Sequence, residues 1–420
     1  MNIKSLLLGS AAALVAVSGA RAADAVVVAE PEPMEYVRIC DVYGAGFYYI
    51  PGTETCLRVG GYVRYDIGVG KVSGLTNVLD KRDLAEALAE RRADYDAAYA
   101  DYLEDGGLED TAANRADFAD ANPLPALRGL KTNNTYYKRA RAAMQLDARS
   151  ETELGTLRGY MHINYNYDTV VVNAVDEAND RVVGRLTDTA DRFAINHAFI
   201  ELGGFRVGKT DSLFSTITGY AGGVIQDDLV SYGPFGTHQI AYTYTGGNGF
   251  SATVGVEEGN GVDFTIDSYA PHVVAGAGWT QGWGGVSGVV GYDSVWNEWA
   301  GKLRLDVNAT EQLSLFAMAG YGSEKNAPVS FYKQWSGKWA VWGGGTYRFN
   351  EKASVNLQGS WAQGKGKFES PRQAAVVANV AYELVPGFVI TPEVAWTQER
   401  AVNGDRESQW GGFLRFQRSF

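Results

Sequence analysis

The chain ends on the stretch WGGFLRFQRSF (410–420), and this stretch decides how the rest of the sequence is interpreted. Alternate side chains fall into two sets, one largely apolar and one largely polar. The first set is Trp410, Gly412, Leu414, Phe416 and Arg418, and the second is Phe413, Arg415, Gln417 and Ser419. Alternation that ends on an aromatic carboxyl terminus is typical of the closing strand of an outer-membrane β-barrel, with one face toward lipid and the other toward water. A soluble antiparallel sheet also alternates, so the remaining sequence must decide between the two.

The N-terminus indicates export. Lys4 precedes an apolar run over 6–17, and Ala20 and Ala22 stand where a signal peptidase cleaves. We therefore expect a signal peptide at 1–22, cut after Ala22. Downstream of it no uninterrupted apolar stretch reaches the length of about 18 residues that a helical span needs. An exported chain of this kind is either soluble or a barrel.

Composition favours the barrel. The 51 Gly, 24 Tyr and 10 Trp, with only 11 Pro and 5 Met, describe many short strands with aromatic ends rather than a helical core. The length would also allow two soluble domains, but no shift in composition marks a second one. We expect a periplasmic N-terminal segment at 23–56 and an all-β transmembrane barrel at 57–420.

The two cysteines, Cys40 and Cys56, both precede the first convincing strand. In an oxidising compartment they are expected to form one disulfide that closes a short loop. A metal or redox site is a poor alternative, because the spacing is not C-x-x-C and no histidine lies nearby.

Sixteen strands can be drawn along the chain. The first starts at Leu57, where Val59, Val63 and Tyr65 alternate with polar neighbours. The others are expected at 136–150, 155–168, 193–203, 204–213, 238–246, 249–258, 271–281, 284–292, 298–308, 311–321, 337–349, 352–364, 373–384, 387–399 and 408–420. Tight turns alternate with longer loops, as in outer-membrane barrels. A sixteen-stranded barrel is too wide for its own side chains to fill, so we expect a water-filled lumen.

Aromatic residues near the predicted strand ends, among them Trp279, Trp299 and Trp361, are interpreted as girdles at the membrane interfaces. A stacking track for sugars is the alternative interpretation.

Several long blocks of the chain resemble the general porins of alphaproteobacteria, of the rhizobial type. These blocks are EYVRICDVYGAGFYYIPGTETCLRVGGYVRYD (35–66), SETELGTLRGY (150–160), FIELGGFRVGKTDSLF (199–214), GYAGGVIQDDLVSYGPFGTHQIAYTY (219–244) and the terminal stretch. The resemblance implies a homotrimer of diffusion pores, each narrowed by its third external loop, that pass small hydrophilic solutes. It also implies contact with outer-membrane lipid and lipopolysaccharide. The barrel-assembly machinery would recognise the C-terminal strand through Phe420, Phe416 and Trp410. No cofactor and no nucleic acid is implied.

The first external loop, 77–130, departs from this pattern by its length. Within 77–120 the run DKRDLAEALAERRADYDAAYADYLED predicts a helical insertion, with Leu84, Leu88, Tyr95, Tyr99 and Tyr102 at helical spacings of three, four or seven. This stretch holds 13 acidic and 5 basic residues, a local charge of −8 in a chain of −12. We expect a solvated surface cap; folding over the pore mouth is the alternative.

The segment 211–237 stands where the family folds a loop into the lumen, and its charges are Asp227 and Asp228. Alternation points six arginines inward from the first three strands: Arg58, Arg64, Arg139, Arg141, Arg149 and Arg158. Acids on an inserted loop facing bases on the wall would set up a field across a narrow, wet passage. The two acids could instead be solvated loop residues. The arginines could instead pair with interior carboxylates such as Asp66 or Asp147.

The acidic balance predicts weak cation preference. A substrate-specific channel, for example for sugars, is the alternative function. An enzyme is disfavoured, because the four histidines, His162, His197, His238 and His272, lie on separate strands or loops and GVSG at 285–288 lacks the nucleophile elbow. No phosphate-binding loop or metal-ligand spacing is present in the sequence.

Overall fold

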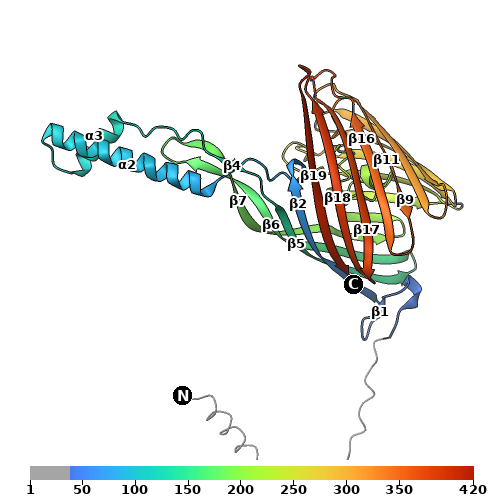
Figure 1. Cartoon of the computed structure of the whole chain (residues 1–420). Coiled ribbons are helices and arrows are strands. Elements are labelled where there is room, and N and C mark those ends of the chain that lie inside the picture. The colour runs from blue at the N-terminus through green and yellow to red at the C-terminus, as the bar shows by residue number, and fades with distance from the viewer. Residues whose placement is uncertain (1–37) are drawn as a thin grey trace, which may run out of the picture. The chain divides into compact units, whose positions relative to one another are not determined.

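A computed structural model describes residues 38–420, in which sixteen antiparallel strands form a closed sheet (Figure 1). The strands are β2 (Cys56–Gly70), β5 (Tyr137–Thr152), β6 (Gly155–Asp176), β7 (Arg181–Leu202), β8 (Phe205–Asp211), β9 (Gly236–Thr245), β10 (Phe250–Glu257), β11 (His272–Gln281), β12 (Gly284–Asp293), β13 (Glu298–Asn308), β14 (Leu313–Gly322), β15 (Trp339–Arg348), β16 (Ala353–Ala362), β17 (Arg372–Val385), β18 (Phe388–Arg400) and β19 (Arg406–Ser419). Because β19 pairs with β2, the sheet has no free edge. The predicted all-β fold and strand number are confirmed; the signal peptide lies outside the described residues.

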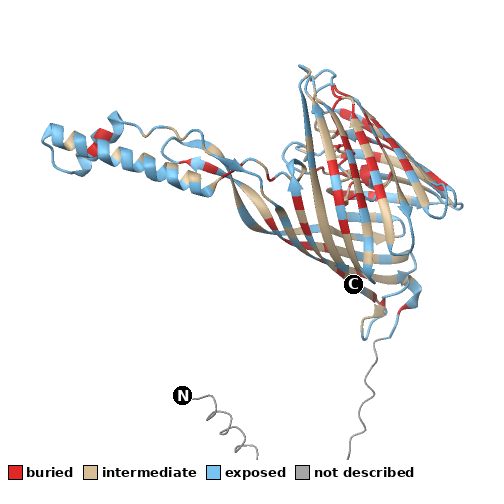
Figure 2. Cartoon of the chain, viewed as in Figure 1, coloured by how far each residue is buried: buried red, intermediate tan, exposed pale blue. Residues whose placement is uncertain are grey.

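The two faces of the closing strand are those that alternation predicts. On the inner face, the Arg415 Nε lies 2.7 Å from the Asp66 carboxylate, and Arg64 donates a hydrogen bond of 2.8 Å to Gln417. On the outer face, Trp410 is 63% exposed. Figure 2 shows buried and exposed positions alternating along the strands around β11 and β16. Polar groups therefore line the lumen and apolar groups face outward.

Connections at the two ends of the barrel differ in length. At one end, Gly203 and Gly204 join β7 to β8 with φ of +55° and +97°, a backbone that favours glycine. A Cβ on Gly203 would lie 2.6 Å from the Leu154 carbonyl oxygen of the neighbouring turn, so the turns pack closely. At the other end, longer loops join β2 to β5, β8 to β9 and β14 to β15. This asymmetry marks the short-turn end as periplasmic and the long-loop end as external.

The segment before the barrel is held at the short-turn end. Cys40 and Cys56 form a disulfide with a Cα–Cα distance of 6.0 Å, as predicted. The segment also contributes a short strand, β1 (Tyr48–Tyr49), to β2. Phe47, which is buried, lies under Arg58 with the guanidinium 5.1 Å from its ring centre. The disulfide loop therefore packs against the first barrel strand.

The predicted helical insertion is present as α2 (Lys81–Gly106) and α3 (Ala112–Ala121). The Asp80 carboxylate caps α2 by accepting from the amides of Arg82 and Asp83, and Gly107 ends it in the left-handed conformation. The two helices are joined by an aromatic cluster of Tyr95, Tyr99, Tyr102 and Phe118.

The predicted apolar stripe of α2 is only partly used in this packing. Tyr99 is its one buried residue among those described, whereas Leu88 is 40% exposed. No helix within residues 38–420 has the length and apolar character to cross a membrane.

The segment from Val170 to Phe193, which lies between the predicted strands 155–168 and 193–203 and was therefore expected to be a loop, is mostly strand. β6 and β7 continue as a hairpin through the pair Asp176↔Arg181. A two-stranded sheet of β3 (Val78–Leu79) and β4 (Thr132–Asn133) lies beside β7, and α2 and α3 continue from it (Figure 1). The expectation was wrong because this part carries polar residues on both faces, so the alternation that marks a lipid-facing strand is absent there.

Candidate pore constriction

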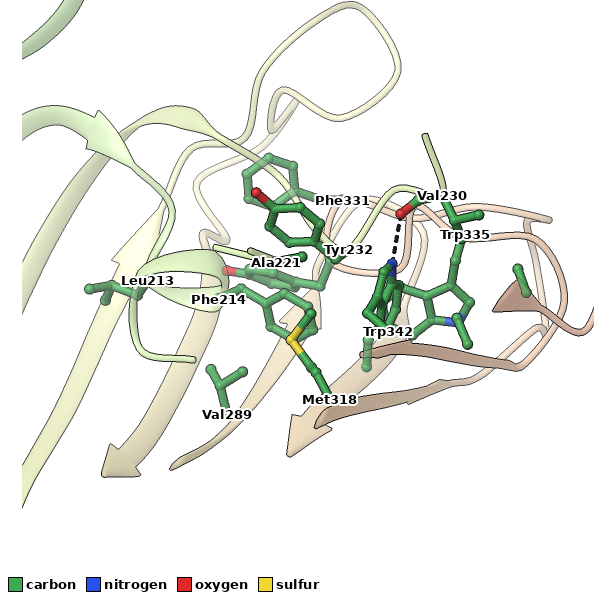
Figure 3. Packing of buried hydrophobic residues seen from close by; sticks show 14 of the residues in the cluster. Leu213, Phe214, Ala221, Val230, Tyr232, Val289, Met318, Phe331, Trp335 and Trp342 are labelled. Carbon is green, nitrogen blue, oxygen red and sulfur yellow. Dashed lines mark hydrogen bonds between the residues drawn. The ribbon is translucent and has the colours of Figure 1, made fainter. Parts of the chain in front are cut away.

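The connection between β8 and β9, residues 212–235, is called here the inward loop. It begins with a short helix, α4 (Leu213–Thr216), capped by Ser212. Its Phe214 and Tyr232 side chains are 0% and 1% exposed, and they pack with Met318, Phe331 and the other residues of Figure 3. Because these partners belong to the barrel wall and to the β14–β15 loop, the inward loop lies against the inner wall.

Polar contacts anchor the loop along its length. The Glu257 carboxylate of β10 accepts hydrogen bonds from the Ser212 hydroxyl and the Leu213 amide, both at 2.7 Å. The Trp342 indole of β15 donates to the Val230 carbonyl at 2.7 Å (Figure 3). Further anchors come from β13, β16, β17 and β18, through Arg304, Gln358, Asn379 and Glu393. So many backbone groups are satisfied by wall side chains that the loop is held in one place.

The two acidic residues of the loop have different surroundings. Asp227 accepts a hydrogen bond of 2.9 Å from the Tyr232 hydroxyl, and its burial raises the pKa of its carboxyl to about 6. The neighbouring Asp228 adds to this shift through its negative charge. Asp228 itself is exposed. Of the two acids, only Asp228 is therefore exposed to solvent.

The six arginines predicted to point inward all contact polar groups of the inner face. Three of them surround the Asp147 carboxylate, which is 2% exposed: Arg58 at 3.6 Å, Arg149 at 2.8 Å and Arg158 at 2.9 Å. Arg139 lies 2.6 Å from the Asp168 carboxylate. Interior ion pairing, which the sequence analysis left as an alternative, is thus a property of four of the six.

Arg64 and Arg141 differ from those four. Each donates its Nε hydrogen to a neutral amide, Gln417 at 2.8 Å and Asn166 at 2.6 Å. Neither forms an ion pair with any residue in the described part of the chain. Their positive charge is therefore not compensated locally.

Sequence reasoning missed four members of this cluster. Arg206 of β8 contacts Glu201 of β7 at 2.6 Å, and Arg158 reaches the same carboxylate at 2.8 Å. Arg415 and Asp168 complete the set. Alternation already puts Arg415 on the water-facing side of the closing strand and could have placed Arg206 inward as well, but the partners of both follow from strand register. The arginine wall is defined here as Arg58, Arg64, Arg139, Arg141, Arg149, Arg158, Arg206 and Arg415.

The arginine wall and the inward loop occupy different arcs of the barrel. The strands carrying the arginines, β19, β2, β5, β6 and β8, lie in one run of the hydrogen-bonded order that also includes β7. Most of the strands that anchor the inward loop lie in the remaining run, from β10 to β18, and the Tyr220 hydroxyl also donates a hydrogen bond to Asp211 at the end of β8. Within the wall, eight arginines face four carboxylates, Asp66, Asp147, Asp168 and Glu201. These strands therefore carry an excess of four positive charges, on a different arc of the inner wall from most of the anchors of the loop that bears the two acids.

A wide, wet barrel with a charged inner wall and a loop folded against its inside defines a membrane channel of the porin class. Comparison with known proteins agrees. A family model described as "Porin subfamily" matches residues 24–122 and 111–413. Porin Omp2a of Brucella melitensis is 44% identical over 434 residues, and Porin Omp2b of Brucella suis is 43% identical over 445, each covering the whole of both chains. The chain belongs to this porin family and is an outer-membrane diffusion channel.

A solved structure shows the same fold at low sequence identity. The outer membrane channel DcaP of Acinetobacter baumannii matches with a TM-score of 0.60 at 14% identity, over 89% of this chain and 99% of that one.

Proposed function

We propose that the inward loop and the arginine wall form the constriction of a general diffusion pore for small hydrophilic solutes, with Asp227 and Asp228 on one side and the arginines on the other. The observation that carries the proposal is their placement on separate arcs of one inner wall. Charges of opposite sign across a narrow aqueous passage order the water between them. A polar solute aligns its dipole in that field, whereas an apolar solute must displace ordered water. Selection is then by size and polarity, with no energy source.

We also propose a weak preference for cations. The chain carries a net charge of −12, of which the stretch 77–120 contributes −8 at the external end. Such a surface concentrates cations near the entrance, within about 10 Å at moderate salt. The preference stays weak because the uncompensated positive charge of the arginine wall acts in the opposite direction.

The assembled form is proposed to be a homotrimer in contact with outer-membrane lipid and lipopolysaccharide. Trp410 and Phe416 lie on the outer face of β19 and Phe420 follows it, so the final strand offers an aromatic edge to the barrel-assembly machinery during folding. The Phe420 amide and carbonyl both bond to Gly61 of β2 at 3.0 Å, so the last residue takes part in closing the barrel.

The proposal is tested by single-channel recording of the refolded protein in a planar bilayer under a salt gradient. Three equal, ohmic steps and a small cation-selective reversal potential are expected, with no block by added sugars. Saturable block by a sugar would show a substrate-specific channel instead. Anion selectivity would contradict the proposed charge balance.

A further inference from the structure

Three arginines form a row on the outer face of the barrel at its external rim. Arg372 of β17 is paired directly with Arg400 of β18, and Arg400 is paired directly with Arg406 of β19. Side chains directly opposite on neighbouring strands have Cβ atoms about 4.5–5.5 Å apart, and like charges at that distance repel. The row is therefore an unfavourable arrangement for the barrel alone.

Strand parity fixes the face to which these arginines belong. Arg400 shares its face with Val394, which is 51% exposed, and Arg406 shares its face with Trp410. Glu399 and Glu407, each next to one of these arginines in sequence, therefore belong to the inner face. They are also directly opposed on neighbouring strands. Positive charge is thus sorted to the outside of this rim and negative charge to the inside.

No acidic side chain neutralises the row. Within residues 38–420, none of the ion pairs closer than 4.0 Å includes any of the three arginines. Of the acids adjacent in sequence, Glu399 and Glu407 belong to the inner face, and Asp405 accepts a hydrogen bond of 2.7 Å from Asn403.

The row also borders a small cavity. A recess of about 100 Å³ is lined by Lys365, Ser370, Arg372 and Arg400, together with residues of the β18–β19 loop. The Lys365 amide donates to the Ser370 carbonyl at 2.6 Å, which fixes the β16–β17 loop beside Arg372. This loop fits closely, because a Cβ on Gly364 would lie 2.3 Å from the Arg372 amide nitrogen. Two arginines and a lysine therefore line one recess, which is large enough for a group of a few atoms.

Below the row on the same face lie tryptophans. The Trp396 and Trp410 rings are 6.4 Å apart, and the Arg372 guanidinium lies 5.9 Å from the Trp361 ring centre. Tryptophan on the outer face of a barrel marks the level of the lipid headgroups. The arginines lie beyond these tryptophans toward the external end of the strands, at the level expected for the phosphates of an outer-leaflet lipid.

We propose that Arg372, Arg400 and Arg406, with Lys365, bind the phosphate groups of a glycolipid of the outer leaflet. A guanidinium presents a planar pair of donors that matches phosphate oxygens, and a phosphate dianion removes the repulsion within the row. The tryptophans below supply the apolar surface for the attached acyl chains. The site rests on the proposed contact with outer-membrane glycolipid but not on the constriction, because all its residues lie outside the lumen.

The test is titration of the folded, fluorescently labelled protein in detergent with diphosphoryl lipid A, and with the same lipid after removal of both phosphates. The wild-type protein should prefer the phosphorylated lipid, and R372Q/R400Q/R406Q should lose that preference by about tenfold or more. The matched control R82Q/R92Q/R181Q removes three exposed arginines elsewhere and should bind as wild type does.

Two further variants keep the test decisive if the triple glutamine variant does not fold. R372K/R400K/R406K retains the charges and should retain most of the preference, whereas R400Q alone should lose part of it. Channel conductance should be unchanged in all of them. Equal weakening in the control triple, or no preference in the wild type, would overturn the proposal. Full competition by millimolar inorganic phosphate would show a site for free anions, and a change in oligomeric state without a change in lipid binding would show a contact between copies of the chain.

Discussion

The Arg91 guanidinium and the Asp176 carboxylate form two hydrogen bonds, of 2.7 and 3.0 Å, that join α2 to the end of the β6–β7 hairpin. Arg91 is 10% and Asp176 2% exposed in the side chain, so water competes little for this pair. Arg91 also donates to the Pro125 carbonyl at 3.2 Å, which ties in the segment after α3. One arginine thus connects the helical insertion to the barrel's longest hairpin.

Replacing Arg91 by alanine should release the helical insertion. The change leaves the Asp176 carboxylate without its cation, at a cost of about 1–3 kcal/mol in local stability. Limited proteolysis should then cut within 77–130 at least several times faster, while the barrel band survives. Arg92→Ala is the matched control, because Arg92 is 85% exposed and its contact with Asp96 is 4.0 Å long. Equal cleavage of the two variants would contradict a role for the pair.

Neutralising different members of the arginine wall should have separable effects. Arg64→Gln and Arg141→Gln remove charges that form no ion pair with a carboxylate in the described part of the chain, so the reversal potential should move toward cation selectivity with little change in stability. Arg139→Gln removes the partner of Asp168, which is 2% exposed, and should also destabilise the folded barrel by about 1–3 kcal/mol. The temperature at which the folded band disappears on a gel measures the second effect. Arg418→Gln, at the short-turn end of the outer face, is the control and should leave selectivity unchanged.

Cation preference should depend on pH through Asp227. Because the pKa of this carboxyl is raised to about 6, it is ionised at pH 7.5 and largely protonated at pH 5. Acidification through pH 6 removes one negative charge from the inward loop, and the reversal potential should move toward zero. Asp227→Asn should abolish this step, and Asp228→Asn should retain it with a smaller cation preference throughout. A step that persists in Asp227→Asn would assign the titration to another group.

The hydrogen bond from Trp342 to Val230 should limit movement of the inward loop. Trp342→Phe keeps an aromatic side chain but removes the donor, at a cost of about 1 kcal/mol. Open-channel current noise and brief closures should both increase, while the mean conductance stays close to wild type. Trp339→Phe is the matched control, since Trp339 lies on the outer face and is 49% exposed. Indistinguishable noise in the two variants would argue against this anchor.

Strand number and strand faces could be predicted because the lipid–water boundary imposes a period of two on the sequence. Where alternation breaks down, the prediction failed: in the β6–β7 hairpin near Asp176, valines and polar residues are mixed on both faces of the strands. The inward direction of Arg58 and Arg149 followed from alternation in the same way. Their shared partner, Asp147, did not, because it depends on which residues of β2, β5 and β6 stand opposite one another.

The sequence alone determined that this chain is an exported, sixteen-stranded barrel with arginines on its inner face, because those properties follow from local composition and from the spacing of apolar and polar residues. Only the tertiary structure decided where the inward loop is anchored, that Asp227 is partly buried beside Tyr232, and that Arg372, Arg400 and Arg406 stand in one row. The anchors and the row depend on register between strands or on contacts between residues more than a hundred positions apart, such as Trp342 and Val230. Such pairings are set by the closure of the whole sheet, and no local pattern encodes them.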